Sequence, residues 1–234
     1  MPAPSIELLI EFTKDDDPRT RATAVAGLAK VADPRGYAPV LVSLFDPADE
    51  VRIAAATALG IFADARSFEP LAECLTDPCE QVGVNCAWAL AQTPDTRCIV
   101  KLFEVVASEA YTETVRAAAA TAIGERAELE GSDLSTSDDL IAQATEALLA
   151  GAASTCDDVR AASFWSIGHM PATPETLAAC RAALADPHEW TLRYAIEALA
   201  HIGSREDAVA LEALLDDERE EISTLAAQAI EMLR

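Results

Sequence analysis

The chain has 234 residues, 51% of them hydrophobic, and a formal net charge of −23 that arises from 40 acidic residues against 17 basic ones. This composition is ample for a packed core, and its charge excludes nucleic-acid binding, which needs concentrated Lys and Arg. Apolar runs such as 54–63 are too short and too rich in alanine to span a bilayer, so we expect no membrane segment.

The N-terminal sequence and the cysteines predict a cytoplasmic protein. Residues 1–7 contain no basic cluster and meet an acid early, so we expect no signal peptide. The cysteines lack CxxC pairs and are interpreted as small buried hydrophobes of a reducing compartment; they are Cys74, Cys79, Cys86, Cys98, Cys156 and Cys180.

One sequence motif recurs along the chain, and its rhythm is called the cadence below. It consists of Asp-Pro, Val-Arg, Ala-Ala and Ala-Leu-Gly in this order, and it is clearest from Asp46 to Gly60. Arg21 and Arg52 occupy the same place in it, 31 residues apart, and Arg116 and Arg160 return later. A fixed period of this length indicates stacked supersecondary units in a single elongated domain, which we expect to cover 1–234.

Each repeat divides into two amphipathic helices, and no sustained period-two alternation predicts a strand. The first helix, A, follows the Asp-Pro turn; we expect A helices at 18–31, 49–62, 80–92, 112–126, 157–169, 188–202 and 219–233. The second helix, B, is expected at 36–45, 66–76, 96–107, 137–151, 174–185 and 205–215, with a capping helix at 5–12. Small inner A residues should allow close stacking of neighbouring repeats; they are Ala24, Ala55, Ala119, Ala162, Ala195 and Ala226.

One interval breaks the period. Arg116 and Arg160 are 44 residues apart, and the surplus predicts an insertion loop at 128–139. Insertions in solenoids emerge on one edge, where they often serve function. The alternative is a tolerated spacer that ends in a helix cap at Ser137.

The cadence resembles the HEAT repeat, most of all the short bacterial variety named after the phycobilisome bilin lyases. The resemblance covers nearly the whole chain in about seven units and implies an all-α fold, a right-handed α-solenoid of HEAT-like helical hairpins. It also implies an Asp–Arg ladder between repeats. Gly83 and Ser223 replace the arginine, and Arg193 stands one place late, so those repeats should lack the ladder contact. The repeat serves lyases, hydroxylases, glycosylases and scaffolds, and so implies no single activity.

Catalytic and metal motifs are not evident in the sequence. His169 and His201 lie near helix C-termini, where the helix dipole favours imidazole. His188-Glu189 resembles the His-Glu pairs of HEAT-like iron hydroxylases but occurs once, and a metal needs at least three ligands. Cys79 and Cys156 share the turn position of His188 in other repeats, which we interpret as an echo of the repeat. We expect no catalytic residue, metal or cofactor.

The B helices are expected to line the inner curve and to form an acidic groove. Its candidate partner-binding residues are Glu69, Glu73, Lys101, Glu104, Glu175, Glu206 and Glu212, with Arg205 as a second base. Six acids against two bases would attract a basic helix or tail. The alternative is a merely solvated face.

A second candidate surface is a ridge on the A helices, made of Val84, Trp88, Phe164 and Trp165. Trp88 and Trp165 replace polar residues at the corresponding place in other repeats, and exposed aromatics are typical of binding hot spots. The alternative is that each ring packs on a neighbouring helix. Trp190, at a helix start, is interpreted as a staple-like contact.

The sequence thus predicts a non-enzymatic protein-interaction scaffold or adaptor, monomeric or weakly associated, whose protein partner carries a basic segment. Nucleic acid and membranes are not expected as partners. The alternative is a subunit of a bilin-lyase-like or other HEAT-repeat enzyme that acts on a chromophore or a protein.

Overall fold

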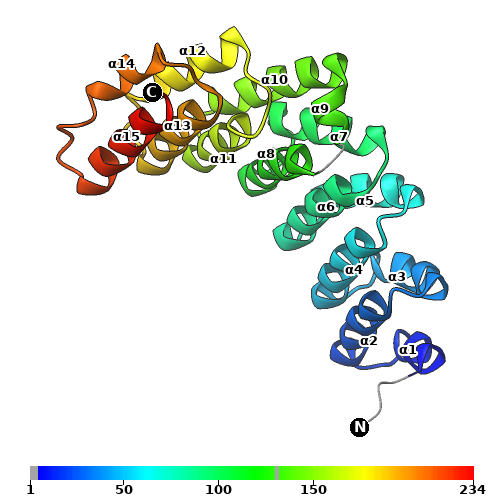
Figure 1. The fold of residues 1–234 in the computed structure, drawn as a ribbon. Coiled ribbons are helices and arrows are strands. Elements are labelled where there is room, and N and C mark those ends of the chain that lie inside the picture. The colour runs from blue at the N-terminus through cyan, green and yellow to red at the C-terminus, as the bar shows by residue number, and fades with distance from the viewer. Residues whose placement is uncertain (1–4, 130–131) are drawn as a thin grey trace. The chain divides into compact units, whose positions relative to one another are not determined.

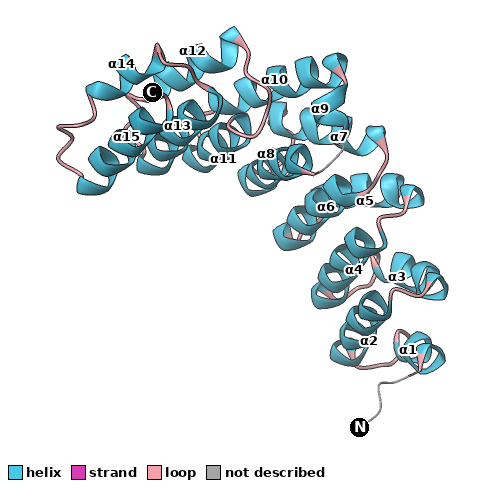
Figure 2. Cartoon of the chain, viewed as in Figure 1, coloured by secondary structure: helices cyan, strands magenta, loops and turns pink. Residues whose placement is uncertain are grey.

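The computed structural model describes residues 5–129 and 132–234, and every regular element in those ranges is helical (Figures 1 and 2). The expected all-α solenoid of stacked hairpins is therefore confirmed. The A helices are α2 (Pro18–Val31), α4 (Asp49–Phe62), α6 (Glu80–Gln92), α8 (Glu113–Glu128), α11 (Asp157–Ile167), α13 (Glu189–Ile202) and α15 (Glu220–Met232).

The B helices alternate with them along the chain. They are α3 (Tyr37–Ser43), α5 (Phe68–Glu73), α7 (Thr96–Ala107), α10 (Asp138–Ala152), α12 (Pro174–Ala183) and α14 (Asp207–Glu212). Short 3-10 turns at Pro34–Gly36, Ala65–Ser67 and Cys74–Thr76 flank α3 and α5, which are shorter than expected. The chain begins with α1 (Ile6–Phe12), capped by the Ser5 side chain.

The expected insertion at 128–139 includes residues 130 and 131, which lie outside the described residues. On either side of them, α8 ends at Glu128 and a short helix, α9, covers Asp133–Thr136. The Ser137 hydroxyl then accepts the backbone N–H of Leu140 at 3.4 Å and caps α10. Ser137 is therefore the N-cap of the B helix.

By its internal contacts the chain divides into two compact units, unit 1 (Met1–Leu102) and unit 2 (Phe103–Arg234). In unit 1, α4 packs between α2 and α6; in unit 2, α11 packs between α8 and α13, and α15 follows on α13. We call the A helices of a unit its A layer and the B helices its B layer.

The glycine that ends the repeat cadence explains how closely the A helices pack. A Cβ added at Gly60 would lie 3.2 Å from the Ala89 Cα of the next A helix, and one at Gly168 would lie 3.1 Å from the Ala198 Cα. Only glycine allows this backbone approach without displacing the neighbour. At the expected inner alanine of α11, Ala162 is half-buried and the fully buried residue is Ser163, one place later.

The two layers of each unit are unequally spaced. Consecutive A helices are in contact along their length, whereas consecutive B helices such as α10 and α12 touch at only a few residues. A two-layer stack bends toward its more tightly spaced layer. In each unit taken by itself, the A layer is therefore on the inner side, and the expectation that B helices line the inner curve is wrong.

Candidate functional site: two surfaces of the helical layers

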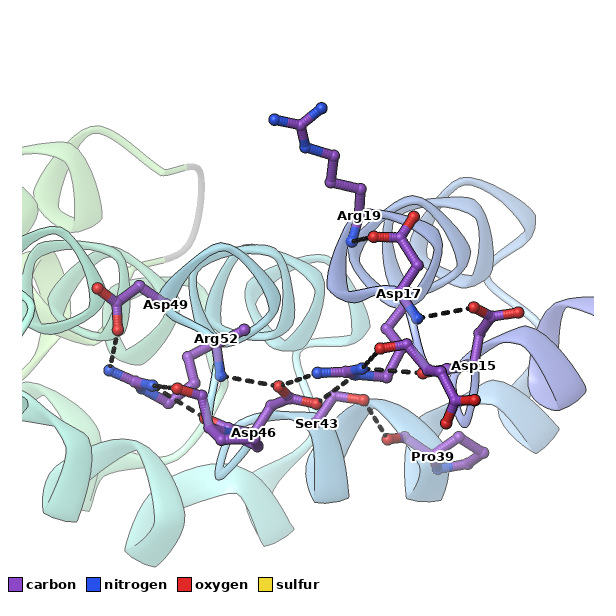
Figure 3. Close-up of polar contacts among 12 residues, drawn as sticks. Asp15, Asp17, Arg19, Pro39, Ser43, Asp46, Asp49 and Arg52 are labelled. Carbon is purple, nitrogen blue, oxygen red and sulfur yellow. Dashed lines mark hydrogen bonds and ion pairs between the residues drawn. The ribbon is translucent and has the colours of Figure 1, made fainter.

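An arginine–aspartate ladder fixes the turns that begin the A helices. The Arg52 guanidinium donates two hydrogen bonds to the Asp77 carboxylate, at 2.8 and 2.9 Å, and a third to the Asp46 carbonyl at 2.9 Å. It also bonds to Asp49 at 2.8 Å, as Figure 3 shows. The same two-pronged contact joins Arg21 to Asp46 and Arg160 to Asp186. The ladder expected from the resemblance is present in these repeats.

The ladder carboxylates are ionised despite their burial. Burial by itself raises the pKa of Asp77, but the hydrogen bonds from Arg52 and from the Cys79 backbone N–H outweigh it, so its pKa lies below the ordinary value. Asp46 and Asp186 have lowered pKa values through the same balance of burial against arginine and backbone donors. The ladder is therefore a chain of half-buried ion pairs that supports structure and leaves no reactive group.

Among the described residues, the ladder contact is missing from α13, where the sequence departs from the pattern, and also from α8, where the arginine is present as Arg116. Leu192 stands at the arginine position of α13, and Asp217, which would be its partner, pairs instead with Arg219 at 2.9 Å. Arg193 reaches Glu221 at 2.6 Å, on a largely exposed carboxylate. Arg116 is buried and donates from Nε to the Val106 carbonyl at 3.1 Å. These repeats replace the ladder contact with weaker or neutral ones.

The six candidate glutamates of the B helices are all exposed. Glu69 lies 3.8 Å from the Arg97 guanidinium. Four of them have no ion-pair partner among the described residues, namely Glu73, Glu175, Glu206 and Glu212. Lys101 is half-buried, and Arg205 is exposed. Glu69, Glu73 and Lys101 belong to unit 1, and the other candidates belong to unit 2.

The sequence analysis missed a row of arginines at the start of the B helices of unit 1, two of them in the preceding 3-10 turns and one in the first turn of α7. This arginine row consists of Arg35, Arg66 and Arg97, and each pairs with the aspartate two residues before it at 2.7–2.8 Å. The Arg66 Cζ lies 4.3 Å above the Tyr37 ring centroid, and the Arg97 Cζ lies 4.5 Å above that of Phe68. The repeated Asp-x-Arg at 31-residue spacing was the available signal. In unit 1, these cations reduce the acidic excess beside Glu69.

The ridge expected on the A helices is only partly present. Val84, Trp88 and Trp165 are half-buried on α6 and α11, but Phe164 is only 3% exposed. Phe164 precedes Trp165 by one residue, which turns it about 100° around the helix and into the core. Its place on the ridge is therefore wrong.

Trp165 instead forms part of a pocket on the A layer of unit 2. The pocket has a volume of about 360 Å³ and lies between α8, α11 and α13. It is lined by Ala117, Thr121, Asp158, Ala161, Ala162, Trp165, Trp190 and Tyr194. Trp190 is 53% exposed, and its ring centroid is 5.9 Å from that of Tyr194. Trp190 thus makes a local contact at the helix start, with Tyr194 four residues later, and its ring also forms a pocket wall that is open to solvent.

A second pocket of about 430 Å³ lies on the other side of α11, against α10 and α12. Leu149, Phe164 and several alanines line it, with Asp186 at its edge. No lysine or arginine is among its lining residues.

The histidines and cysteines are held by local structure. Cys79, Cys156 and His188 are the N-cap residues of α6, α11 and α13, as their common repeat position indicated. His169 stacks on Trp165 with ring centroids 4.2 Å apart, and its Nε2 lies 3.0 Å from Glu128. Within residues 5–129 and 132–234, no three His, Cys, Asp or Glu residues are grouped as a metal would require.

The thiols of unit 1 include one interacting pair. Cys74 and Cys86 are both buried, and the hydrogen bond between them lowers the pKa of Cys74 while it raises that of Cys86, to which burial adds. In unit 2, burial raises the pKa of Cys180 to about 12. A thiol that is buried and protonated is a poor nucleophile.

No described helix combines the length and the apolar character needed to cross a membrane.

Comparison with known proteins places this geometry in a family. The model of HEAT repeats matches residues 6–84 and 145–231, and that of a HEAT-like repeat matches 113–170. No curated protein sequence matches the chain significantly.

Among solved structures, an engineered protein is 20% identical with a TM-score of 0.57, covering 97% of this chain and 68% of its own. The complex of CpcE and CpcF of phycocyanin lyase from Nostoc sp. PCC7120 is 19% identical with a TM-score of 0.55, covering 100% and 96%. A designed armadillo repeat protein in complex with the peptide (KR)4 is 18% identical with a TM-score of 0.54, covering 99% and 100%. At these identities the similarity shows the fold alone. The family models extend over most of the chain and coincide with the helical hairpins, and the chain belongs to the HEAT-repeat family.

Proposed function

We propose that this chain is a non-enzymatic protein-interaction module whose partner presents a basic segment to the exposed acids of the B layer. The observation that carries this proposal is the set of exposed carboxylates without ion-pair partners at Glu73, Glu175, Glu206 and Glu212. They belong to a chain with a net charge of −23. A carboxylate that is not held in an ion pair leaves its field available to a ligand, although Arg181 offsets part of the charge of Glu206, so these groups attract a basic segment over a distance of about one Debye length.

The similar fold of a designed armadillo repeat protein gives this proposal a direct probe. That protein was solved with the peptide (KR)4, a short chain of alternating lysine and arginine. Stacked helical hairpins can therefore present a surface long enough for an extended basic peptide. For the present chain, unit 2 offers the more strongly acidic B layer, because the arginine row lies in unit 1.

The test is the affinity of the full chain for labelled (KR)4 by fluorescence anisotropy at low and high salt. We expect binding that weakens as salt rises, because the attraction is a sum of screened charge pairs. Reversal of Glu175, Glu206 and Glu212 to lysine should slow association and flatten the salt dependence. The matched control reverses Glu11, Glu218 and Glu231, which lie outside the B helices and change the net charge equally.

Two results would contradict the proposal. One is affinity for (KR)4 that does not change with salt. The other is an equal loss in the two triple variants, which would mean that only the total charge matters. A bound chromophore in protein purified from its native source, seen as visible absorbance, would favour the rival role in bilin handling. The pocket beside α10 and α12 does not favour that role, because bilin propionates are bound by cations and no lysine or arginine lines this pocket.

A further inference from the structure

Arginines in this chain repeatedly combine an aromatic ring with a carboxylate. In the arginine row, Arg66 lies over Tyr37 and Arg97 over Phe68 while each is paired with its aspartate. In unit 2, the Arg193 Cζ lies 5.0 Å from the Trp190 ring centroid while Nη1 bonds to Glu221 at 2.6 Å. The planar guanidinium can satisfy both partners at once, because it stacks through its face and donates hydrogen bonds from its edge.

The pocket on the A layer of unit 2 offers the same two partners, and no arginine is among its lining residues. Asp158 is its only ionisable acid or base other than Tyr194, and it has no ion-pair partner among the described residues. The adjacent Asp157 is the one that pairs with Arg160, at 2.7 Å. The aromatic walls are Trp165 on α11 and Trp190 with Tyr194 on α13. A carboxylate and three rings therefore converge on one solvent-open space.

The walls and floor of the pocket are fixed by packing. A Cβ at Gly124 would lie 2.6 Å from Cζ3 of Trp165, so this glycine makes room for the ring against α8. The Trp165 ring is also packed against His169, with ring centroids 4.2 Å apart. Ala117, Ala161 and Ala162 leave the floor shallow and apolar, which suits an aliphatic stem below a charged group.

The charges around the pocket favour a cation. Glu189 and Glu197 lie on α13 on either side of Trp190 and Tyr194 in sequence, and Glu189 is exposed. Arg193 is the nearest base on that helix, and Glu221 already neutralises it. Arg193 lies against the Trp190 ring but leaves it half exposed. The ring therefore remains accessible to a second cation from the pocket side.

We propose that this pocket binds an arginine side chain of the partner's basic segment, with the guanidinium against Trp165 and Trp190 and hydrogen-bonded to Asp158. This inference rests on the proposed function, since it assumes a basic partner, and it adds an arginine-specific anchor on the layer opposite to the B-layer acids. A carboxylate beside aromatic faces favours arginine over lysine, because the planar guanidinium can stack on a ring and donate two hydrogen bonds to the carboxylate. The compact ammonium ion of lysine stacks less well.

The test compares (KR)4 with octalysine, a peptide of the same charge, on the full chain at one salt concentration. We expect (KR)4 to bind about three- to tenfold more tightly, the range of one partly desolvated cation–π contact. Asp158→Asn and Trp190→Ala should each remove most of that preference, mainly by faster dissociation. Phe12→Ala is the control, because Phe12 is an exposed aromatic residue on α1 of unit 1 and lies outside this pocket and outside both candidate surfaces. Far-UV circular dichroism confirms that each variant is folded.

The outcomes separate this inference from the proposed function. Equal affinity for the two peptides, unchanged in Asp158→Asn and Trp190→Ala, would overturn the arginine pocket. The proposed function would still stand if binding then depended on salt and on Glu175, Glu206 and Glu212. Absence of (KR)4 binding at low salt would overturn both. Concentration-dependent self-association that is lost in Trp190→Ala would also overturn the arginine pocket, because the occupant would then be a second copy of this chain.

Discussion

Removal of Arg52 tests whether the arginine–aspartate ladder stabilises the fold. Arg52→Ala deletes both bonds to Asp77 and those to the Asp46 and Pro47 carbonyls. The Asp77 side chain, 9% exposed, then keeps only the Cys79 N–H at 2.8 Å. Leaving a buried charge without its partner costs about 3–5 kcal/mol, and an exposed pair contributes little. The Arg52 side chain is 12% exposed, so we expect a loss of about 2–4 kcal/mol.

A double-mutant cycle measured by urea denaturation isolates the pair itself. Arg52→Ala and Asp77→Ala should each be destabilising, and the double variant should cost little more than Arg52→Ala alone, because the stranded carboxylate is gone. The control is Arg66→Ala, whose side chain is 70% exposed and whose pairing with Asp64 should contribute little. Strictly additive losses in the cycle, or an unchanged urea midpoint in Arg52→Ala, would refute the reasoning.

The same pair predicts a pH dependence with a definite sign. Because the pKa of Asp77 is lowered in the folded state, its contribution is complete above the ordinary value of 3.8. That contribution is lost as the pH falls through the lower folded-state pKa. The stability difference between the wild type and Arg52→Ala should therefore be constant near neutrality and should shrink in acid below that value. A difference that grows on acidification would contradict the assignment.

Four further predictions concern packing, charge, the backbone and metal. Ala55 is fully buried between A helices, so Ala55→Leu should cost about 1–3 kcal/mol in urea denaturation, and an unchanged midpoint would show that the helix faces are misassigned. Burial, with repulsion from Glu128, raises the pKa of Glu125, so Glu125→Gln should raise Tm at neutral pH and lose this advantage as acid protonates the wild-type carboxyl. Ala63 ends α4 with a left-handed φ of 48°, so Ala63→Gly should stabilise by up to about 1 kcal/mol; a lower Tm would exclude strain there. Elemental analysis should find no stoichiometric zinc or iron, and either metal at one equivalent would overturn the structural role given to His188.

The sequence predicts the helices well because each repeat carries its own signals for the start and the end of a helix. The Asp-Pro turn, the buried residue equivalent to Val51 and the closing glycine recur at the same places in the repeats. An ambiguous helix boundary in one repeat can therefore be assigned from the others. Helices α2 and α4 begin and end at the residues expected, whereas the B helices α3 and α5 are shorter than expected and are flanked by 3-10 turns.

Surface geometry was harder to predict, because it depends on the rotation of each helix against its neighbour. A single residue of offset places Phe164 in the core and Trp165 in the pocket. Trp190 joins that pocket from the next repeat, a proximity that one-dimensional spacing does not encode. The arginine row was visible as a repeated Asp-x-Arg, but its stacking on aromatic rings requires the three-dimensional turn.

The ladder also determines which helices are expected to open together. Where every contact is present, as along α2, α4 and α6, each A-helix turn is tied to the next, and the amide protons of these helices should exchange with solvent as one cooperative block. At the C-terminal end the corresponding ion pair connects two B helices instead of two A-helix turns. Arg181 of α12 pairs with the fully buried carboxylate of Asp207 at the start of α14. The adjacent α15 has no ladder contact, so its amide protons should exchange before those of α14. Local unfolding at this end is therefore expected to begin with α15 while α14 remains folded.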